Sequence, residues 1–430
     1  MVMGSTVCLR RIGEGQRRHQ VGFGRFLANH KVTIGRLIAG WSDQTAVAAS
    51  GRHVLAIQDT SEISFHTTSA HRRGLGEIGK GGRARGLLLH AMLALDAQSG
   101  ACLGLAGGQI WTRRGRVKVA HQKRKFDDKE SHRWITTAEQ GKRTLAAARM
   151  VTMVSDRESD IFAVWARVPE ENVHLIARSM HDRRLADGTS LYKTATSFAV
   201  CGTRTIELPE REHKHTARPA RLSLRFGAVE LARPHRAIEL PKSVPLTFIE
   251  VIEQNPPRGA EPVHWRLLTT HPLADAKAAW QIVDWYKMRW AIEQFWRLLK
   301  LQGLQLEDSQ LQTAERLIKL TAIAAKAAIT TFQLLQARDG RSPEPASLAF
   351  ADHEIALLDK LNTRTEGATA LQKNPHPKAS LAWAAWIIAK LGGWDGYPSS
   401  KPPGPITFKH GLERFHTMVQ AWSIQNVCIP

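Results

Sequence analysis

The chain has 430 residues and 43% of them are hydrophobic, which is enough for two or three folded domains and excludes a disordered polypeptide. Lys and Arg total 60 against 39 for Asp and Glu, a formal charge of +21, so nucleic acid is the first expected partner and a ribosomal-type or membrane-surface protein is the alternative. The four cysteines are scattered without a Cys-x-x-Cys pair, which excludes a zinc ribbon and a disulfide framework and favours a reducing cytoplasm.

The first half of the chain reads as helices followed by strands that end near aspartates. Residues 1–20 are basic with little periodicity, and residues 21–50 are expected to be largely helical. A short apolar run at 54–57 is of strand type and is followed by Asp59. Apolar stretches between 87 and 105 are expected to pair as strands. A run at 151–154 precedes Asp156, and a third strand is expected at 173–177.

The second half changes from strands to helices. Prolines and alternating apolar residues in 184–262 predict antiparallel β-structure with tight turns, as an inserted subdomain. Helical signals cover 275–301 and 313–337. The second helix is apolar but is interrupted by two lysines, which indicates a buried or amphipathic helix rather than a membrane span. A Pro-containing linker at 342–345 precedes short helices expected in 346–430.

Two basic runs, 113–118 and 123–125, are candidates for following a DNA backbone. Phosphate contacts of this kind give an affinity that falls steeply with salt. Basic runs are also common on ordinary solvated surfaces, and both interpretations remain open for these two.

Asp59 and Asp156 each stand close to the end of an apolar strand run. Phosphodiester cleavage needs an activated water and a stabilised leaving oxygen, and Mg²⁺ ions held by carboxylates supply both. Carboxylates at the ends of adjacent buried strands hold such ions stiffly. An aspartate after a strand is also a common turn former or helix cap, so position alone does not decide between the two roles.

A third group of polar residues lies in the segment expected to be helical at 275–301. Tyr286, Arg289, Glu293 and Lys300 have offsets of 0, 3, 7 and 14. At about 100° per residue they fall in a stripe about 60° wide on one helix face. The glutamate is placed to complete a metal site and the two basic residues suit phosphates. The alternative is a solvated face of Glu–Arg and Glu–Lys pairs.

These motifs together resemble the insertion-sequence-four family of cut-and-paste DDE transposases. The four residues match the family's Tyr-x2-Arg-x3-Glu-x6-Lys signature, and Ile57-Gln-Asp-Thr60 and Asp156-Arg-Glu158 resemble its two aspartate motifs, in the same order. The similarity extends from about residue 25 to residue 424, and the ending at 402–412 also resembles the family's C-terminal region.

The resemblance implies an α/β fold of the ribonuclease-H-like (retroviral-integrase-like) type, with a mixed sheet, flanking helices, a β-rich insertion and a helical C-terminal domain. It implies that Asp59, Asp156 and Glu293 are catalytic and bind Mg²⁺, with Mn²⁺ as the alternative, and that Tyr286, Arg289 and Lys300 contact DNA. Two further DNA-binding positions are implied. Trp265 resembles a tryptophan that stacks on a flipped base, and Arg178 resembles an arginine near the cut. A core tryptophan and a surface arginine are the alternatives.

The implied domains are a shortened N-terminal DNA-binding region at 1–50, a catalytic domain at 51–183 and 263–340, the insertion at 184–262, and a helical dimerisation domain at 346–430. The implied function is metal-dependent cleavage at transposon ends through a hairpin intermediate, with strand transfer into target DNA. A homodimer would act on double-stranded DNA in the cytoplasm of a bacterium, at the nucleoid.

One alternative arises because only 58 residues precede Asp59: an N-terminally truncated, catalytically idle family member that acts as a dimerising inhibitor. A general metal-dependent nuclease and a structural nucleic-acid-binding protein are further alternatives. The Tyr-Arg-Glu-Lys spacing argues against both, because neither needs it.

Overall fold

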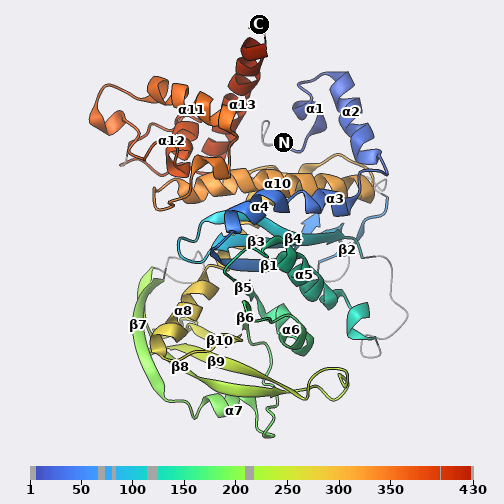
Figure 1. Ribbon diagram of the computed structural model, residues 1–430, viewed down its shortest axis with the longest axis vertical. Coiled ribbons are helices and arrows are strands. Elements are labelled where there is room, and N and C mark those ends of the chain that lie inside the picture. The colour runs from blue at the N-terminus through green and yellow to red at the C-terminus, as the bar shows by residue number, and fades with distance from the viewer. Residues whose placement is uncertain are drawn as a thin grey trace.

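The computed structural model describes residues 6–65, 73–79, 84–113, 124–208, 217–397 and 399–427. Within these residues one ten-stranded mixed sheet organises the chain (Figure 1), in the order β2-β3-β1-β5-β6-β10-β9-β8-β7 with β4 paired to β3. Its strands are β1 (His53–Ser64), β2 (Gly76–Ile78), β3 (Ala84–Asp96), β4 (Cys102–Trp111), β5 (Met150–Ser155), β6 (Val173–Arg178), β7 (Val200–Leu208), β8 (Arg218–Ala232), β9 (Ser243–Glu253) and β10 (His264–Thr269).

Three neighbouring strands at the centre of the sheet, β1, β5 and β6, are parallel. Strand β3 is antiparallel to β1, and β4 is antiparallel to β3. The mixed α/β class is therefore as predicted, and so are the strands at 54–57, 151–154 and 173–177. The prediction that the first run ends before Asp59 is wrong, because pairing with β3 continues β1 as far as Ser64.

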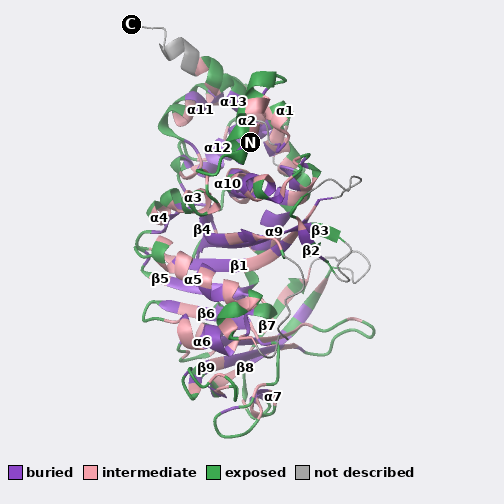
Figure 2. Cartoon of the chain, turned by 90° about the vertical axis from the view of Figure 1, so that its right-hand side faces the viewer, coloured by how far each residue is buried: buried purple, intermediate pink, exposed green. Residues whose placement is uncertain are grey.

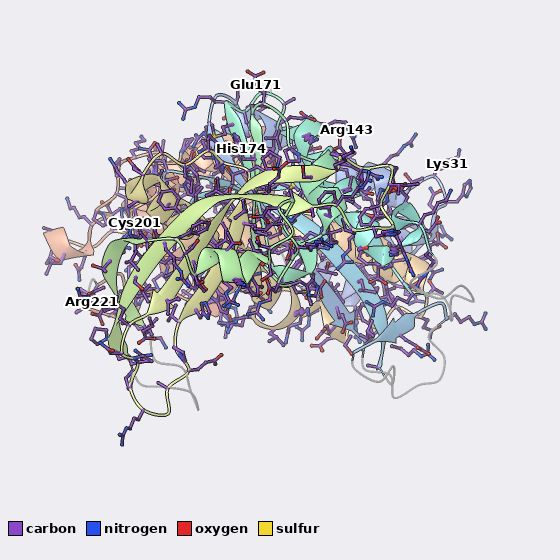
Figure 3. All side chains as sticks on the ribbon, turned by 90° about the horizontal axis from the view of Figure 1, so that it is seen from below. Lys31, Arg143, Glu171, His174, Cys201 and Arg221 are labelled. Atoms are coloured by element: carbon purple, nitrogen blue, oxygen red, sulfur yellow. The ribbon has the colours of Figure 1, made fainter. Side chains whose placement is uncertain are left out.

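The stretch 184–262 is β-structure, as predicted, with one short helix, α7 (Leu191–Ala195). It does not form a sheet of its own. Strands β7, β8 and β9 pair antiparallel in sequence, β9 pairs with β10, and β10 pairs with β6. The insertion therefore extends the central sheet. In the view from below (Figure 3), Cys201 and Arg221 mark the side of β7 and β8, and Lys31 and Arg143 lie on the opposite side.

Helices cover both faces of the sheet, whose central strands are mostly buried (Figure 2). On one face α5 (Arg133–Thr144) and α6 (Phe162–Arg167) pack through Trp134 and Trp165. On the other face lie α8 (Ala276–Lys287), α9 (Trp290–Arg297) and α10 (Ala314–Ala337), in the same cluster as Leu55 and Ile57. Because side chains alternate along a strand, Asp59 points to the face of α8, α9 and α10.

Helices from both ends of the chain pack around α10 (Figure 1). The N-terminal helices are α1 (Leu9–Ile12), α2 (Arg17–Ala28), α3 (Ile34–Ala39) and α4 (Ser42–Ala49), and the C-terminal ones are α11 (Asp352–Thr365), α12 (Leu381–Leu391) and α13 (Pro405–Val427). The C-terminal helices share a third hydrophobic cluster with the end of α10.

Among the described helices, α10 is the one that is long and apolar enough to cross a membrane, by length and composition alone. Its most apolar window is 72% buried inside the protein. Helix α10 is therefore placed as a core helix, as the sequence predicts for 313–337.

Candidate active site

Asp59 lies in β1, and Asp156 directly follows β5, the neighbouring parallel strand. Ile57 of β1 pairs with Val154 of β5, so each aspartate stands two residues beyond this pair. The backbone N–H of Thr60 donates to Asp59 Oδ1 at 2.8 Å, and the N–H of Glu158 donates to Asp156 Oδ1 at 2.9 Å. Asp156 thereby caps the short 3₁₀ helix η4 (Arg157–Ser159). In both aspartates these bonds fix one oxygen and leave Oδ2 for another partner.

The negative charge of the Asp59 carboxylate is only partly balanced by its neighbours. Its side chain is 15% exposed. Burial, and then repulsion from Asp156, raise the pKa of Asp59 to about 7, against the hydrogen bond from Thr60 and the positive charge of Arg289. The ionised form of Asp59 is therefore disfavoured where it stands, and a cation bound beside it would stabilise that form.

The segment with the Tyr-Arg-Glu-Lys residues is helical, as predicted for 275–301, but it is not one continuous α-helix. Helix α8 ends at Lys287 and α9 begins at Trp290, with a tight turn between them, in which the Arg289 N–H donates to the Tyr286 carbonyl at 3.0 Å. After α9 the chain continues as a π-helix, η5 (Leu298–Gln302). The calculation that placed the four signature residues on one helix face assumed a regular α-helix, so it does not hold across the break between α8 and α9.

Arg289 lies between two of the predicted acidic residues. It donates to Asp59 Oδ2 and to Glu293 Oε1, each at 3.4 Å, and its side chain is 16% exposed. One guanidinium thus neutralises a carboxylate of β1 and a carboxylate of α9 at the same time. The contact with Asp59 shows that Arg289, at the turn before α9, points toward the sheet.

Three further predicted residues, Tyr286, Trp265 and Arg178, lie close to one another and near Arg289. Tyr286 is buried, and burial raises the pKa of its phenol. The half-buried Trp265 packs edge-on against Tyr286, with ring centroids 6.1 Å apart. Arg178 donates to the carbonyl of His264 at 2.9 Å, and burial, followed by repulsion from Arg157, lowers its pKa. Stacking of Trp265 on a base remains a prediction, and in this structure its ring has a protein partner.

Lys300 lies in the π-helix η5. Burial lowers the pKa of Lys300, against the attraction of four acidic residues that include Glu293 and Asp59. Despite the broken helix, the four signature residues therefore belong to one electrostatic environment.

The residues fit a hard divalent cation by their chemistry, since Asp59, Asp156 and Glu293 offer only carboxylate oxygens. Within the described part of the chain, however, no three His, Cys, Asp or Glu side chains are close enough to hold one ion. Glu293 instead shares Arg289 with Asp59. The three predicted carboxylate ligands are thus not gathered around one point in this structure.

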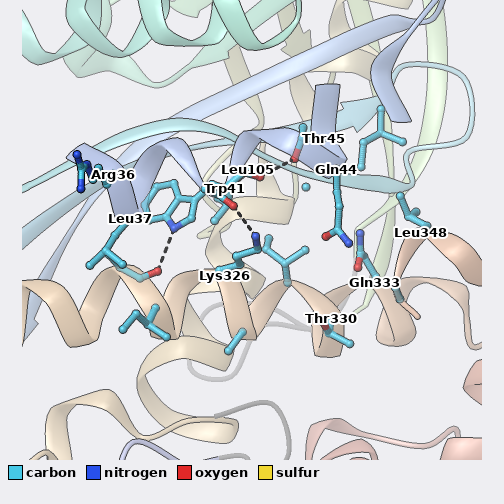
Figure 4. Close-up of a pocket in the computed structure, with 18 residues that line it drawn as sticks. Arg36, Leu37, Trp41, Gln44, Thr45, Leu105, Lys326, Thr330, Gln333 and Leu348 are labelled. Atoms are coloured by element: carbon cyan, nitrogen blue, oxygen red, sulfur yellow. Dashed lines mark hydrogen bonds between the residues drawn. The ribbon is translucent and has the colours of Figure 1, made fainter. Parts of the chain in front are cut away.

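A pocket of about 460 Å³ lies elsewhere, between α3, α4, β4 and α10 (Figure 4). Trp41 borders it and donates to the carbonyl of Ala322 at 3.0 Å, and Lys326 donates to the carbonyl of Gly40. None of the predicted site residues lines this pocket. It is therefore separate from the acidic site.

Sequence reasoning missed Arg133, at the start of α5, which contacts Thr60 and Glu158 beside the two aspartates. Of the two basic runs, residues 114–118 and 123 lie outside the described residues. Arg113 pairs with Glu130 at 2.8 Å and with Glu62 at 3.4 Å.

No model of a known protein family matches the chain. Any assignment of function therefore depends on the motifs and on the geometry around the two aspartates.

Proposed function

We propose that this chain is a metal-dependent DNA transposase of the DDE type with a ribonuclease-H-like catalytic core. The observation that carries the proposal is the position of Asp59 in β1 and of Asp156 directly after the adjacent parallel strand β5, with Arg289 hydrogen-bonded to both Asp59 and Glu293. The strand order β4-β3-β1-β5-β6, with helices on both faces, supports the core that is proposed.

In this proposal Asp59, Asp156 and Glu293 hold Mg²⁺, or Mn²⁺ in its place. When bound, the ions supply an activated water or hydroxyl and stabilise the leaving oxygen of the phosphodiester. Arg289 has the planar, doubly donating guanidinium that suits a phosphate. Because burial raises the pKa of Tyr286, its phenol stays protonated and donates a hydrogen bond to a phosphate oxygen.

The substrate in this proposal is double-stranded DNA at transposon ends and in the target. The charge of +21 supports a polyanionic partner. Water cuts one strand, and the freed 3′ hydroxyl attacks the other strand to close a hairpin, which is then opened and joined to target DNA. Lys300, Arg178 and Trp265 contact the DNA near the cut. A homodimer, held by the 346–430 region, works in the bacterial cytoplasm.

The test is cleavage of a labelled duplex that carries the element's own end, with Mg²⁺ or with a chelator. We expect metal-dependent nicking followed by a hairpin. The variant Glu293→Gln should lose cleavage and keep DNA binding. Glu139→Gln is the matched control, because Glu139 is also a helical glutamate paired with a basic residue and of similar exposure, 43% against 37%. Full cleavage by Glu293→Gln would refute the proposal.

Two other results would favour the alternatives. No cutting by a folded chain, together with reduced transposition when it is mixed with an active transposase, would indicate a dimerising inhibitor. Cutting of any duplex without a hairpin would indicate a general metal-dependent nuclease.

A further inference from the structure

We propose that Arg133 is a positioning residue that holds both aspartate segments in register from the face of the sheet opposite to the acidic site. This inference rests on the proposed function of Asp59 and Asp156 as metal ligands. Arg133 is the first residue of α5 and its side chain is only 10% exposed. It touches neither aspartate carboxylate in any described hydrogen bond, and it acts through the residues that follow them.

The first contact is with β1. Arg133 Nε donates to Thr60 Oγ1 at 2.9 Å, and the same hydroxyl lies 2.8 Å from His90 Nδ1. His90 is fully buried and its other ring nitrogen lies 3.2 Å from Gln58 Oε1. The backbone N–H of Thr60 donates to Asp59 Oδ1. The side chain of Thr60 is thus fixed on the face of the sheet that α5 covers, while its backbone N–H orients the Asp59 carboxylate, which lies on the opposite face.

The second contact is with the turn after β5. Arg133 Nη2 donates to Glu158 Oε2 at 2.6 Å. The backbone N–H of Glu158 donates to Asp156 Oδ1 at 2.9 Å. One guanidinium therefore holds the two residues, Thr60 and Glu158, whose amides each fix the Oδ1 atom of an aspartate. In both cases Oδ2 is left free of these bonds.

The guanidinium is itself held rigidly. Arg133 Nη1 donates to the carbonyl of Glu130 at 3.1 Å, and the Arg133 charge lies 5.3 Å from the ring centroid of Trp134. A planar guanidinium has its donors in a fixed fork, so it sets the distance between the two groups that it holds. A lysine has one flexible donor group and cannot fix both partners in the same way.

Residues that orient metal ligands without binding the metal change metal affinity when they are removed, by about 10–100-fold. Side chains alternate along β1, so Thr60 and Arg133 lie on the face opposite to Asp59. DNA that enters at Asp59 is thus not expected to touch Arg133. Loss of Arg133 should weaken metal binding and leave DNA affinity unchanged.

The test is Mn²⁺ binding to the full chain without DNA, followed by electron paramagnetic resonance. Arg133→Gln should raise the Mn²⁺ dissociation constant by about 10–100-fold, and Arg133→Lys should raise it less. Arg167→Gln is the matched control, because Arg167 lies in α6 on the same face, pairs with Asp127 and lies over the ring of Phe126, and contacts neither Thr60 nor Glu158 in its described bonds. Cleavage by Arg133→Gln should recover at high metal concentration, which a loss of folded protein would not allow.

If Arg133→Gln destabilises the fold, Glu158→Gln tests the same contact, because the Glu158 side chain is 63% exposed and its replacement leaves the core intact. We expect weaker Mn²⁺ binding there as well. Wild-type Mn²⁺ affinity in both variants overturns the inference. Equal Mn²⁺ binding by the wild type and Asp59→Asn overturns instead the proposed function on which the inference rests.

Discussion

Asp59→Asn should stabilise the metal-free protein at neutral and alkaline pH while abolishing cleavage. The pKa of Asp59 is raised from 3.8 to about 7, so the folded state binds this proton more tightly than the unfolded state. Stability from this group therefore falls as pH rises from about 4 to about 7. Three pKa units at about 1.36 kcal/mol each give about 4 kcal/mol of destabilisation above pH 7. Asparagine removes the negative charge that causes this destabilisation.

The assay is urea unfolding of wild type and variant with a chelator, at pH 5 and pH 8. The gain for Asp59→Asn should be large at pH 8 and much smaller at pH 5. Asp96→Asn is the control, since Asp96 is similarly exposed, 13% against 15%. Against the effect of burial, hydrogen bonds from Ser99 and Gln98 and the charge of Arg52 lower the pKa of Asp96. Its loss should therefore destabilise the protein at pH 8.

Two results would refute this reasoning. One is a loss of stability for Asp59→Asn at pH 8, and the other is an equal gain at both pH values. Mg²⁺ gives a further check. A cation that binds only the folded state stabilises it, so Mg²⁺ should raise the stability of the wild type and not that of Asp59→Asn.

Four further predictions follow from the same contacts. Arg289→Gln should bind Mn²⁺ more tightly than the wild type in a titration without DNA, because Arg289 competes for Asp59 and Glu293. Tyr286→Phe should keep Mn²⁺ binding and lower the cleavage rate by about 100-fold, as loss of one transition-state donor does. Glu344→Gln should lower stability in urea by roughly 2 kcal/mol, because Glu344 is buried in an ion pair with a one-third exposed Arg52. DNA affinity, measured by fluorescence anisotropy, should fall by about 10³-fold or more between 50 and 200 mM salt.

The central strands were predictable from the sequence because buried parallel strands are continuous apolar runs. The break between α8 and α9 was not, since the residues around Met288 include no glycine or proline to signal it. The turn coincides with the Arg289 contact to Asp59, which is 230 residues away in the sequence. The insertion was read correctly as β-structure. Its continuity with the sheet depends on the pairing of β10 with both β9 and β6, which no local pattern records.

The site was predictable only in part, because local sequence patterns do not record contacts between segments that are distant in the chain. Asp59, Asp156 and the four-residue signature are recognisable by position and spacing. Arg133 is not, because it lies 73 residues from Thr60 and 25 from Glu158 and has no motif of its own. A residue that acts through backbone amides leaves no ligand pattern in the sequence.

The two arginines near the aspartates differ in which atoms they touch, and this difference assigns them opposite effects on a cation. Arg289 donates directly to Asp59 Oδ2, the oxygen that the backbone leaves free, so it occupies the position a cation needs. Arg133 instead contacts Thr60 and Glu158, whose amides hold the Oδ1 atoms of the two aspartates. Loss of the first should therefore tighten metal binding and loss of the second should weaken it. A general effect of positive charge would move both variants in the same direction.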